Sequence, residues 1–363
     1  MLADGSTPQN LSLSASQTQA SGLKFPIDVL HYVETLKSLQ TKGILGSDLA
    51  NVTVDQHYPS FYSIQWMVGI EQALPRAFTL EVDYNANRGL HEMLSIFKNL
   101  PGRVTGVSPR SNWGSFNYFA PIDRSKYAGL QVTLKRRFKR NVFFSAAYAW
   151  AKSHSFGDAD LLNPIQPQDP NNIKSDWGPT PFDIRSRFVA NGLWEIPLDR
   201  WMGLKNPAAK LLAGGWQVSG ILSAQTGTPV NVRNTASGYP TDRPDASGAA
   251  PYLSDYQSGL HQYLNPAAFV TVPLGSASNA QIRPGNLERY GLYSPGLVNL
   301  DASLAKTFSF REKVRLQLRA DAFNTLNHTN LAGLVATINS GSSFGRLTTA
   351  TPRTMQVGAR LTF

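Results

Sequence analysis

The chain has 363 residues, with a formal net charge of +10 and only 16% charged residues. The lack of cysteine excludes a disulfide framework, a thiol nucleophile and a cysteine-based zinc site. The basic charge makes nucleic acid a partner to consider, but so few charged residues are unusual in that class of protein. No apolar run approaches the roughly 20 residues that a membrane helix needs, since the longest, residues 142–151, is about half that length.

Residues 1–61 contain little regular patterning. They predict a weak strand at residues 11–19, a short helix near residues 27–39 and a long loop. The first residues have no basic region, apolar core or cleavage site, so we expect that they are not a signal peptide. We therefore expect either a trimmed mature chain or the C-terminal piece of a longer protein, and we favour the second.

Residues 62–363 contain clear β-strands. Apolar and polar residues alternate along nine segments: residues 63–72, 78–85, 128–135, 142–150, 187–196, 216–225, 298–310, 314–322 and 355–363. Period two is the mark of a strand with one apolar and one polar face. Short turns connect some of these strands, at residues 73–76, 139–141 and 311–313. Long irregular stretches connect others, at residues 87–126, 154–182, 227–297 and 327–352, and one connection of intermediate length covers residues 197–215.

Long and shorter connections alternate when they are counted from the C-terminus. In a transmembrane β-barrel, long extracellular loops alternate with short periplasmic turns in this way. A soluble sandwich or propeller has no physical reason to sort loop length by parity. The sequence therefore predicts an all-β fold, an antiparallel transmembrane β-barrel of about ten strands, counting the weak one at residues 11–19. A spanning sheet must close, because unpaired backbone groups are too costly in lipid.

The final strand, residues 355–363, ends on an aromatic residue. Val357, Ala359, Leu361 and Phe363 share one face of it. This resembles bacterial outer-membrane proteins, in which a final amphipathic strand ending in Phe is the assembly signal. The resemblance implies that these four residues form such a signal, and that the barrel-assembly machinery is a partner.

The two faces of the predicted strands have different expected surroundings. The apolar face would contact outer-membrane lipid, and aromatic residues near the strand ends fit an interfacial girdle: Tyr148, Trp150, Trp194, Trp216, Phe308, Phe310 and Phe363. A dry core could bury the charges of the opposite face only at a large desolvation cost. We predict that these charged residues face a hydrated lumen: Glu81, Asp83, Lys135, Arg187, Glu195, Asp301, Arg315, Arg319, Asp321 and Arg360. Their expected role is to form cross-strand ion pairs.

Catalytic and metal-binding patterns are poor. His91 and Glu92 begin like a zinc-protease helix, but Ser95 stands where the second histidine belongs. An acidic loop could hold calcium, but its spacing does not match an EF-hand, so we expect solvated residues there: Asp158, Asp160, Asp169, Asn171, Asn172 and Asp176. The basic cluster at residues 135–140 spans a predicted turn, and we expect no nucleic-acid interface. We predict no enzyme activity, no cofactor and no metal site.

Six segments together carry a family resemblance: residues 63–75, 81–89, 147–153, 177–188 (Trp-Gly-Pro-Thr-Pro-Phe-Asp-Ile-Arg-Ser-Arg-Phe), 323–330 (Phe-Asn-Thr-Leu-Asn-His-Thr-Asn) and 356–363. In them the chain resembles the C-terminal barrel of TonB-dependent receptors of the Oar-like type, which carry a carboxypeptidase-regulatory-like domain. The resemblance implies a barrel of about 22 strands in the outer membrane, taking up a scarce substrate. Members also have a plug that contacts TonB; we expect none within residues 1–363, so TonB would be reached only through a plug missing here.

Two other interpretations stay open. One is a small autonomous barrel of about ten strands, acting as an outer-membrane channel or a structural membrane protein. The other is a secreted all-β domain for binding or adhesion. The sequence does not identify a substrate, which could be small or polymeric. By position alone, an external ligand would first contact the loops at residues 87–126, 154–182 and 227–297.

Overall fold

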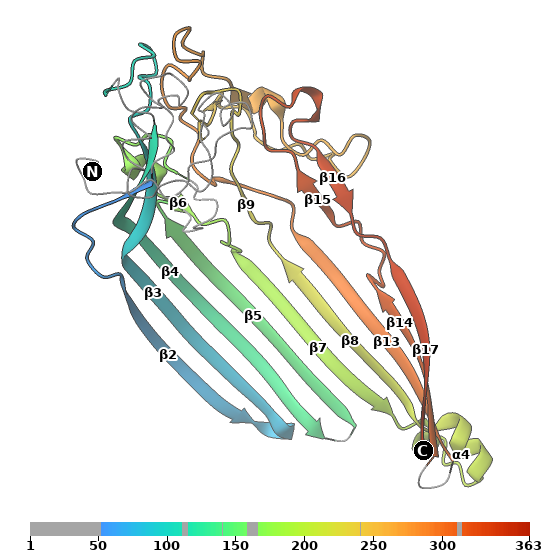
Figure 1. The fold of residues 1–363 in the computed structure, drawn as a ribbon. Helices are drawn as coiled ribbons and strands as arrows, with labels where there is room; N and C mark the ends of the chain where they lie inside the picture. The colour runs from blue at the N-terminus through green and yellow to red at the C-terminus, as the bar shows by residue number, and fades with distance from the viewer. Residues whose placement is uncertain (1–51, 111–114, 140, 158–165, 240, 311–313) are drawn as a thin grey trace, which may run out of the picture.

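The computed structural model describes residues 52–110, 115–139, 141–157, 166–239, 241–310 and 314–363. The weak strand and the short helix predicted within residues 1–61 lie outside these residues. An antiparallel sheet forms the body of the described part (Figure 1). Neither of the α-helices in this part has the length and hydropathy that crossing a bilayer requires.

Nine strands follow one another across the sheet in sequence order, each antiparallel to the next. They are β2 (Tyr62–Leu74), β3 (Phe78–Lys98), β4 (Phe116–Lys139), β5 (Val142–Ser155), β7 (Ser186–Ile196), β8 (Trp216–Gln225), β13 (Leu297–Phe310), β14 (Val314–Phe323) and β17 (Thr354–Thr362). Each contains one of the nine predicted segments, so the strand prediction for residues 62–363 is confirmed. Two short strands join the sheet: β1 (Val52–Val54) pairs with β4, and β6 (Gly178–Pro179) pairs with β5.

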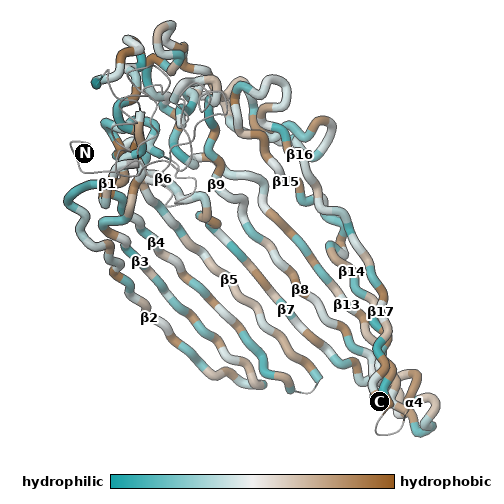
Figure 2. Tube along the Cα trace, viewed as in Figure 1, coloured by the Kyte–Doolittle hydropathy of each residue, from teal (hydrophilic) through white to brown (hydrophobic). Residues whose placement is uncertain are grey.

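The pairing register keeps apolar residues together on one face. A single row of paired residues crosses six strands: Leu80, Leu134, Ala146, Ala190, Leu222 and Leu300. A slip of one residue in any pair would move a whole strand's apolar set to the other side. Figure 2 shows apolar and polar residues alternating along the central strands of the sheet. We call these two surfaces the apolar face and the polar face.

The connections are sorted to the two ends of the sheet, as their lengths predict. The short ones lie at what we call the turn end; β2 and β3 are joined there by η2 (Pro75–Ala77). The β7–β8 connection at the same end contains two short helices, α3 (Leu198–Trp201) and α4 (Pro207–Ala213). The long connections gather at the opposite end, which we call the loop end (Figure 1).

One loop prediction is wrong. Residues 87–98 and 116–126, expected to be loop, continue β3 and β4 as one long hairpin. The register shifts between Leu90 and Glu92 and again between Glu92 and Leu94, so the apolar alternation breaks while the backbone pairing persists. Period two is the signal that reveals a strand in a sequence, and a bulge removes it. The hairpin therefore extends into the region of the long loops.

The long connections form an ordered layer rather than separate loops. We call the described residues of 99–115, 156–185, 226–296 and 324–353 the loop layer. Its elements are η3 (Ile173–Asp176), β9 (Pro229–Val230), β10 (Asp245–Ala246), η4 (Pro266–Ala268), β11 (Phe269–Val270), β12 (Leu292–Tyr293), β15 (Leu331–Leu334), η5 (Gly341–Ser343) and β16 (Leu347–Ala350). The layer has an apolar core of Val232, Leu264, Ala268, Phe269, Leu292 and Phe344. The rings of Phe269 and Phe344 meet edge to face, with centroids 5.4 Å apart.

Candidate functional site

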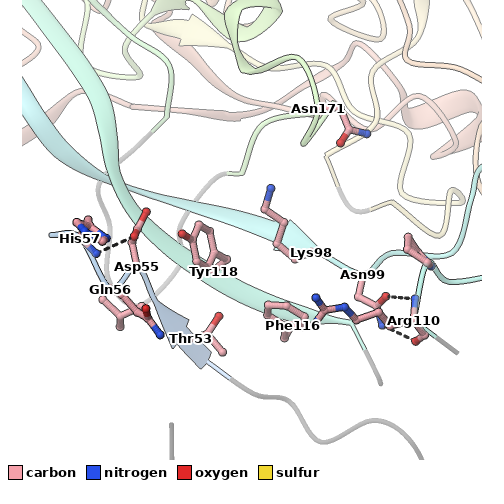
Figure 3. A pocket seen from close by; sticks show the side chains of 12 residues that line it. Thr53, Asp55, Gln56, His57, Lys98, Asn99, Arg110, Phe116, Tyr118 and Asn171 are labelled. Carbon is pink, nitrogen blue, oxygen red and sulfur yellow. Dashed lines mark hydrogen bonds between the residues drawn. The ribbon is translucent and has the colours of Figure 1, made fainter. Parts of the chain in front are cut away.

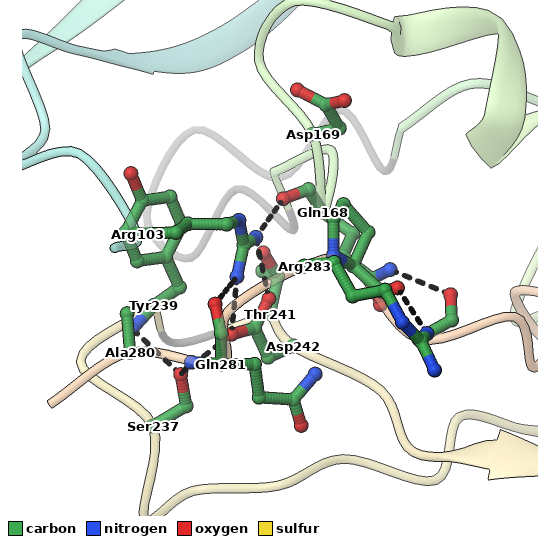
Figure 4. Close-up of polar contacts among 12 residues, drawn as sticks. Arg103, Gln168, Asp169, Ser237, Tyr239, Thr241, Asp242, Ala280, Gln281 and Arg283 are labelled. Carbon is green, nitrogen blue, oxygen red and sulfur yellow. Dashed lines mark hydrogen bonds and ion pairs between the residues drawn. The ribbon is translucent and has the colours of Figure 1, made fainter. Parts of the chain in front are cut away.

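The loop layer is tied together by a buried ion pair. Arg103 makes a bidentate pair with Asp242, with nitrogen–oxygen distances of 2.7 and 2.8 Å. The same guanidinium donates to the carbonyl oxygens of Gln168, at 2.9 Å, and Gln281, at 3.0 Å. It also lies 4.0 Å from the centre of the Tyr239 ring (Figure 4). Because Arg103, Gln168 and Asp242 come from three different connections, this one cation fixes three loops to one another.

A second buried pair joins Arg243 to Asp176, at 2.5 Å. Asp176 also accepts a hydrogen bond from the backbone N–H of Gln168, and the Arg243 Nε donates to the Leu287 carbonyl oxygen at 2.9 Å. The expectation that Asp176 is a solvated loop residue is therefore wrong, since its side chain is fully buried. The local acidic pattern gave no sign of this, because the partner lies far along the chain.

Arg289 anchors the loop layer to the sheet. It is 1% exposed, and its Nε donates to the Asp176 carbonyl oxygen at 2.9 Å. Its Nη2 donates to the carbonyl oxygen of Ser155, the last residue of β5, at 2.8 Å. A cation that reaches two backbone carbonyls fixes the direction in which the chain leaves the sheet.

A buried carboxyl group lies at the same junction. Asp123, on the extended part of β4, accepts hydrogen bonds from the backbone N–H groups of Phe156, at 3.0 Å, and Arg124, at 2.7 Å. Burial raises the pKa of Asp123 to about 6, against the opposing effect of these two hydrogen bonds. The neighbouring Glu92 raises this pKa as well, and Arg289 lowers it. The junction thus contains a group that changes charge in the mildly acidic range.

The segment at residues 177–188 links the sheet to the loop layer through Asp183. Asp183, in its middle, is 2% exposed and accepts the Ser153 backbone N–H at 2.7 Å. Its other oxygen accepts from Arg185, at 2.9 Å, and from the Tyr293 hydroxyl, at 3.0 Å. Burial raises the pKa of Tyr293, so its hydroxyl keeps its proton and remains a donor. Asp183 therefore connects the end of β5 to the loop that precedes β13.

A pocket of about 720 Å³ opens at the loop end beside β1 (Figure 3). Its lining combines apolar residues with polar and charged ones of both signs: Thr53, Val54, Asp55, Gln56, His57, Lys98, Asn99, Pro109, Arg110, Phe116, Tyr118 and Asn171. A hydrogen bond with the Tyr118 hydroxyl is the largest of the effects that hold the pKa of Asp55 below its usual value. Burial, together with this bond, raises the pKa of Tyr118 to about 12. The pocket therefore offers a carboxylate, a phenol and cations to a polar ligand.

The predicted lumen residues all lie on the polar face. The register places Arg187, Glu195, Asp301, Arg315, Arg319, Asp321 and Arg360 opposite the apolar rows. Lys135 and Glu81 form a cross-strand ion pair at 2.8 Å, as expected for this set. Arg319 instead pairs with Asp321 on its own strand, at 2.7 Å. Asp301 accepts from Asn299 and from the backbone N–H of Asn324, both at 2.9 Å.

The terminal residues lie at one edge of the sheet. Val357, Ala359 and Leu361 pair with Ala320, Leu318 and Leu316 of β14. Phe363 follows β17 and is 94% exposed. The apolar face of this last strand therefore continues that of the sheet.

Those histidine and acidic candidates that lie within the described residues are not grouped as a metal site. His91 and Glu92 lie on β3, with His91 in a left-handed backbone conformation (φ 58°), rather than on a helix. Within the part of the chain that the structure describes, no three His, Asp or Glu side chains are grouped closely enough to hold a metal ion. Asp158 and Asp160 lie outside the described residues.

Arg103, Asp242, Arg243 and Arg289 were not candidates on sequence grounds. Arg289 lies 113 and 134 positions from its partners Asp176 and Ser155. Arg103 lies 139 positions from Asp242. No spacing motif links residues at such distances.

Comparison with known proteins gives a family match over nearly the whole chain. A family model described as "Outer membrane beta barrel domain" matches residues 3–356. A search of curated proteins found no match.

Solved outer-membrane proteins resemble the structure at low sequence identity. The outer membrane transporter YddB from Escherichia coli is 12% identical, with a TM-score of 0.48, over 86% of this chain and 34% of that one. The siderophore receptor PiuA from Acinetobacter baumannii is 11% identical, with a TM-score of 0.40, over 83% of this chain and 28% of that one. BauA, the ferric preacinetobactin receptor of the same organism, is 11% identical, with a TM-score of 0.42, over 83% and 29%. The chain thus spans about a third or less of the length of these three proteins.

Proposed function

The chain belongs to the outer membrane beta barrel domain family, and from this premise we propose that it forms part of the wall of a TonB-dependent receptor that imports a substrate across the outer membrane. Membership in the family places the protein in the outer membrane as a β-barrel protein. The receptor assignment goes further and rests on the six sequence segments that resemble the Oar-like type. In this proposal the protein transports and does not catalyse.

The observation that carries the proposal is the division of the sheet into two faces and two ends. An apolar face in continuous register suits lipid, and a polar face with charges of both signs suits a hydrated interior. Short connections at one end and an ordered loop layer at the other match the periplasmic and extracellular sides of such a wall.

The sheet has two free edges among the residues described. β2 pairs only with β3, and β17 pairs only with β14. An open edge in lipid would leave a row of backbone N–H and C=O groups without partners. We propose that further strands, supplied from outside the described residues or from outside this chain, complete the wall to about the 22 strands typical of such transporters.

The loop layer is the proposed surface of first contact for the substrate. The pocket beside β1, which bears cations, opens where this layer meets β3 and β4. The layer is held in place by the Arg103–Asp242 and Arg243–Asp176 pairs. In the proposed orientation this layer faces the outside of the cell. Residues at the pocket, such as Lys98 and Tyr118, would then meet a ligand before it reached the lumen.

The test is the electrophoretic mobility of the chain after folding into detergent or lipid, with and without heating. A closed barrel resists SDS until it is boiled and then runs at a shifted position. We expect no heat-dependent shift, together with aggregation when detergent is removed, because an incomplete wall cannot close. A clear shift would instead support an autonomous small channel, and a monodisperse protein without detergent would overturn the membrane assignment.

A further inference from the structure

The β7–β8 connection, residues 197–215, folds back over the apolar face at the turn end. The rings of Trp194 on β7 and Trp201 in α3 lie with centroids 5.9 Å apart. The Nε1 of Trp216 on β8 donates to the Leu212 carbonyl oxygen in α4, at 3.2 Å. Trp194 pairs with Val142 and Val218 within the apolar rows, and Trp216 pairs with Ile196. The connection is therefore held by side chains of the face that we assign to lipid.

Lys306 clamps α4 to this face. It lies on β13 between Trp216 and Leu318 in the pairing, and only 5% of it is exposed. Its Nζ donates to the carbonyl oxygens of Leu211 and Leu212, both at 2.8 Å, and to that of Gly214. These carbonyls belong to the last turn of α4, where helix geometry leaves acceptors without partners. A cation at that end also matches the negative end of the helix dipole.

Two aromatic rings complete the surroundings of this ammonium group. The Lys306 Nζ lies 4.8 Å from the centre of the Phe308 ring and 5.3 Å from that of the Trp216 ring. A lysine on an apolar face thus has backbone carbonyls and ring faces around its ammonium group. This explains how a charged residue is accommodated there, and it fixes the position of α4.

The outer surface of the connection combines apolar and basic side chains. Trp201, Met202 and Leu212 are 63%, 65% and 67% exposed. Three basic residues lie among them, Arg200, Lys205 and Lys210, against the single acid Asp199. Segments that lie in a membrane interface typically combine exposed tryptophan and leucine with lysine and arginine.

We propose that the β7–β8 connection is an interfacial anchor, which lies in the phospholipid headgroup layer of the periplasmic leaflet. Trp201, Met202 and Leu212 insert among the upper acyl chains, and the basic side chains contact lipid phosphates. The inference rests on the proposed membrane orientation of the sheet. Phospholipid is the partner because the anchor continues the lipid-facing surface without a break and its net charge is positive. A connection directed into the periplasm would instead leave three large apolar side chains in water.

The chain has no cysteine, so single labels can be introduced without background. The experiment places a nitroxide at Leu212→Cys in the full chain, folded into vesicles of phosphatidylethanolamine and phosphatidylglycerol. The measurement is the ratio of collision with oxygen, which concentrates in lipid, to collision with a water-soluble nickel complex. The matched control is Leu260→Cys in the loop layer, because this leucine is 66% exposed, almost the same as Leu212.

We expect the Leu212 label to give a ratio several-fold above that of the Leu260 label. A third label, at Leu304→Cys on the apolar face of β13, separates two kinds of failure. If Leu304 contacts lipid and Leu212 is as accessible to nickel as Leu260, the anchor is wrong while the membrane sheet stands. If Leu304 also reports water, both proposals fail.

A second variant tests the clamp. Lys306→Met removes the ammonium group but keeps an unbranched side chain, so we expect the Leu212 label to gain mobility and lose its lipid contact while Leu304 is unchanged. An unchanged Leu212 label in this variant would show that Lys306 does not hold the anchor. Protection of Leu212 from both collision reagents would indicate a protein partner and would overturn the lipid assignment.

Discussion

The sheet and the loop layer are two regions built for different solvents. Among the described residues, the buried hydrophobic side chains lie almost entirely in the loop layer and in the adjoining ends of β3 and β4; Ala86 and Ala305 are the exceptions on the sheet. The loop layer also holds the buried ion pairs, Arg103–Asp242 and Arg243–Asp176. In contrast, every residue of β2 and of β17 is exposed.

The two regions are therefore stabilised by different forces. The loop layer has a core of its own, so water drives its packing through the hydrophobic effect. The sheet has no protein core on either face, and its stability must come from the backbone ladder and from lipid around its apolar face. Removing the partner of a buried charge should therefore destabilise the loop layer, whereas placing a charge on the apolar face should destabilise the sheet.

The largest effect is expected from Asp242→Ala in the loop layer. It leaves the Arg103 guanidinium largely buried without a counter-charge, which costs about 3–5 kcal/mol. Limited proteolysis or hydrogen exchange of the loops in the membrane-inserted protein would measure this loss. The sheet should stay folded, because its ladder does not involve Asp242.

A matched pair offers the control for that substitution. Asp245 and Arg283 also form a bidentate pair, at 2.6 and 2.9 Å, but the Arg283 side chain is 55% exposed. Asp245→Ala should therefore cost less than about 1 kcal/mol. Equal losses for the two substitutions would show that burial does not distinguish these pairs.

On the sheet, Leu222→Arg should be the more harmful of two neighbouring substitutions. Leu222 faces the apolar side between Ala190 and Leu300, where arginine should cost about 2–4 kcal/mol in lipid. Ser223→Arg, one residue further on the polar face, should stay within about 0.5 kcal/mol. Urea unfolding from lipid vesicles would compare the two variants. If Ser223→Arg were the more harmful, the assignment of the faces would be reversed.

The free energy of unfolding should depend on pH through the ionisation of Asp123. Its pKa is about 6 in the folded protein and about 3.8 when unfolded, so folding favours the protonated form. The folded state binds more protons between these two values, and stability therefore falls as pH rises from about 4 to about 6. The loss is up to about 3 kcal/mol by the usual relation between pKa and free energy.

Asp123→Asn isolates this effect from other carboxyl groups. The amide oxygen can still accept from Phe156 and Arg124 but cannot ionise. The difference in stability between the two proteins should therefore grow between pH 4 and pH 6 and stay level above it. Parallel pH profiles for both proteins would exclude Asp123 as the cause.

The smallest effect is expected at the exposed pair on the polar face. Lys135 and Glu81 pair across β3 and β4, with the Lys135 side chain 54% exposed. Lys135→Ala should cost no more than about 1 kcal/mol, because water and salt screen the pair. A double-mutant cycle with Glu81→Gln would measure the coupling, and a value well above this limit would indicate a dry interior rather than a hydrated lumen.

Much of the sheet could be predicted from the sequence. The alternation at residues 216–225 coincides with β8, and the Arg315, Arg319 and Asp321 side chains fall on the predicted polar face. The orientation of that face toward a lumen, and the assembly role of Val357, Ala359, Leu361 and Phe363, stay predictions. The strands and their two faces could be predicted because they depend on short-range periodicity, which requires no knowledge of distant residues. The assembly role depends instead on the resemblance to outer-membrane proteins.

The all-β class, the nine strands, the two faces and the sorting of loops to opposite ends could all be predicted from the sequence. Each of these follows from spacing along a few neighbouring residues. Three features became visible in the folded chain alone: β3 and β4 extend beyond their periodic segments, the connections at residues 226–296 and 324–353 share one apolar core, and Lys306 holds α4 on the apolar face. The physical reason is that these features depend on contacts between residues far apart in the sequence. Backbone pairing continues in β3 and β4 where the apolar alternation stops, and a buried charge such as Lys306 takes the partners that lie near it in space.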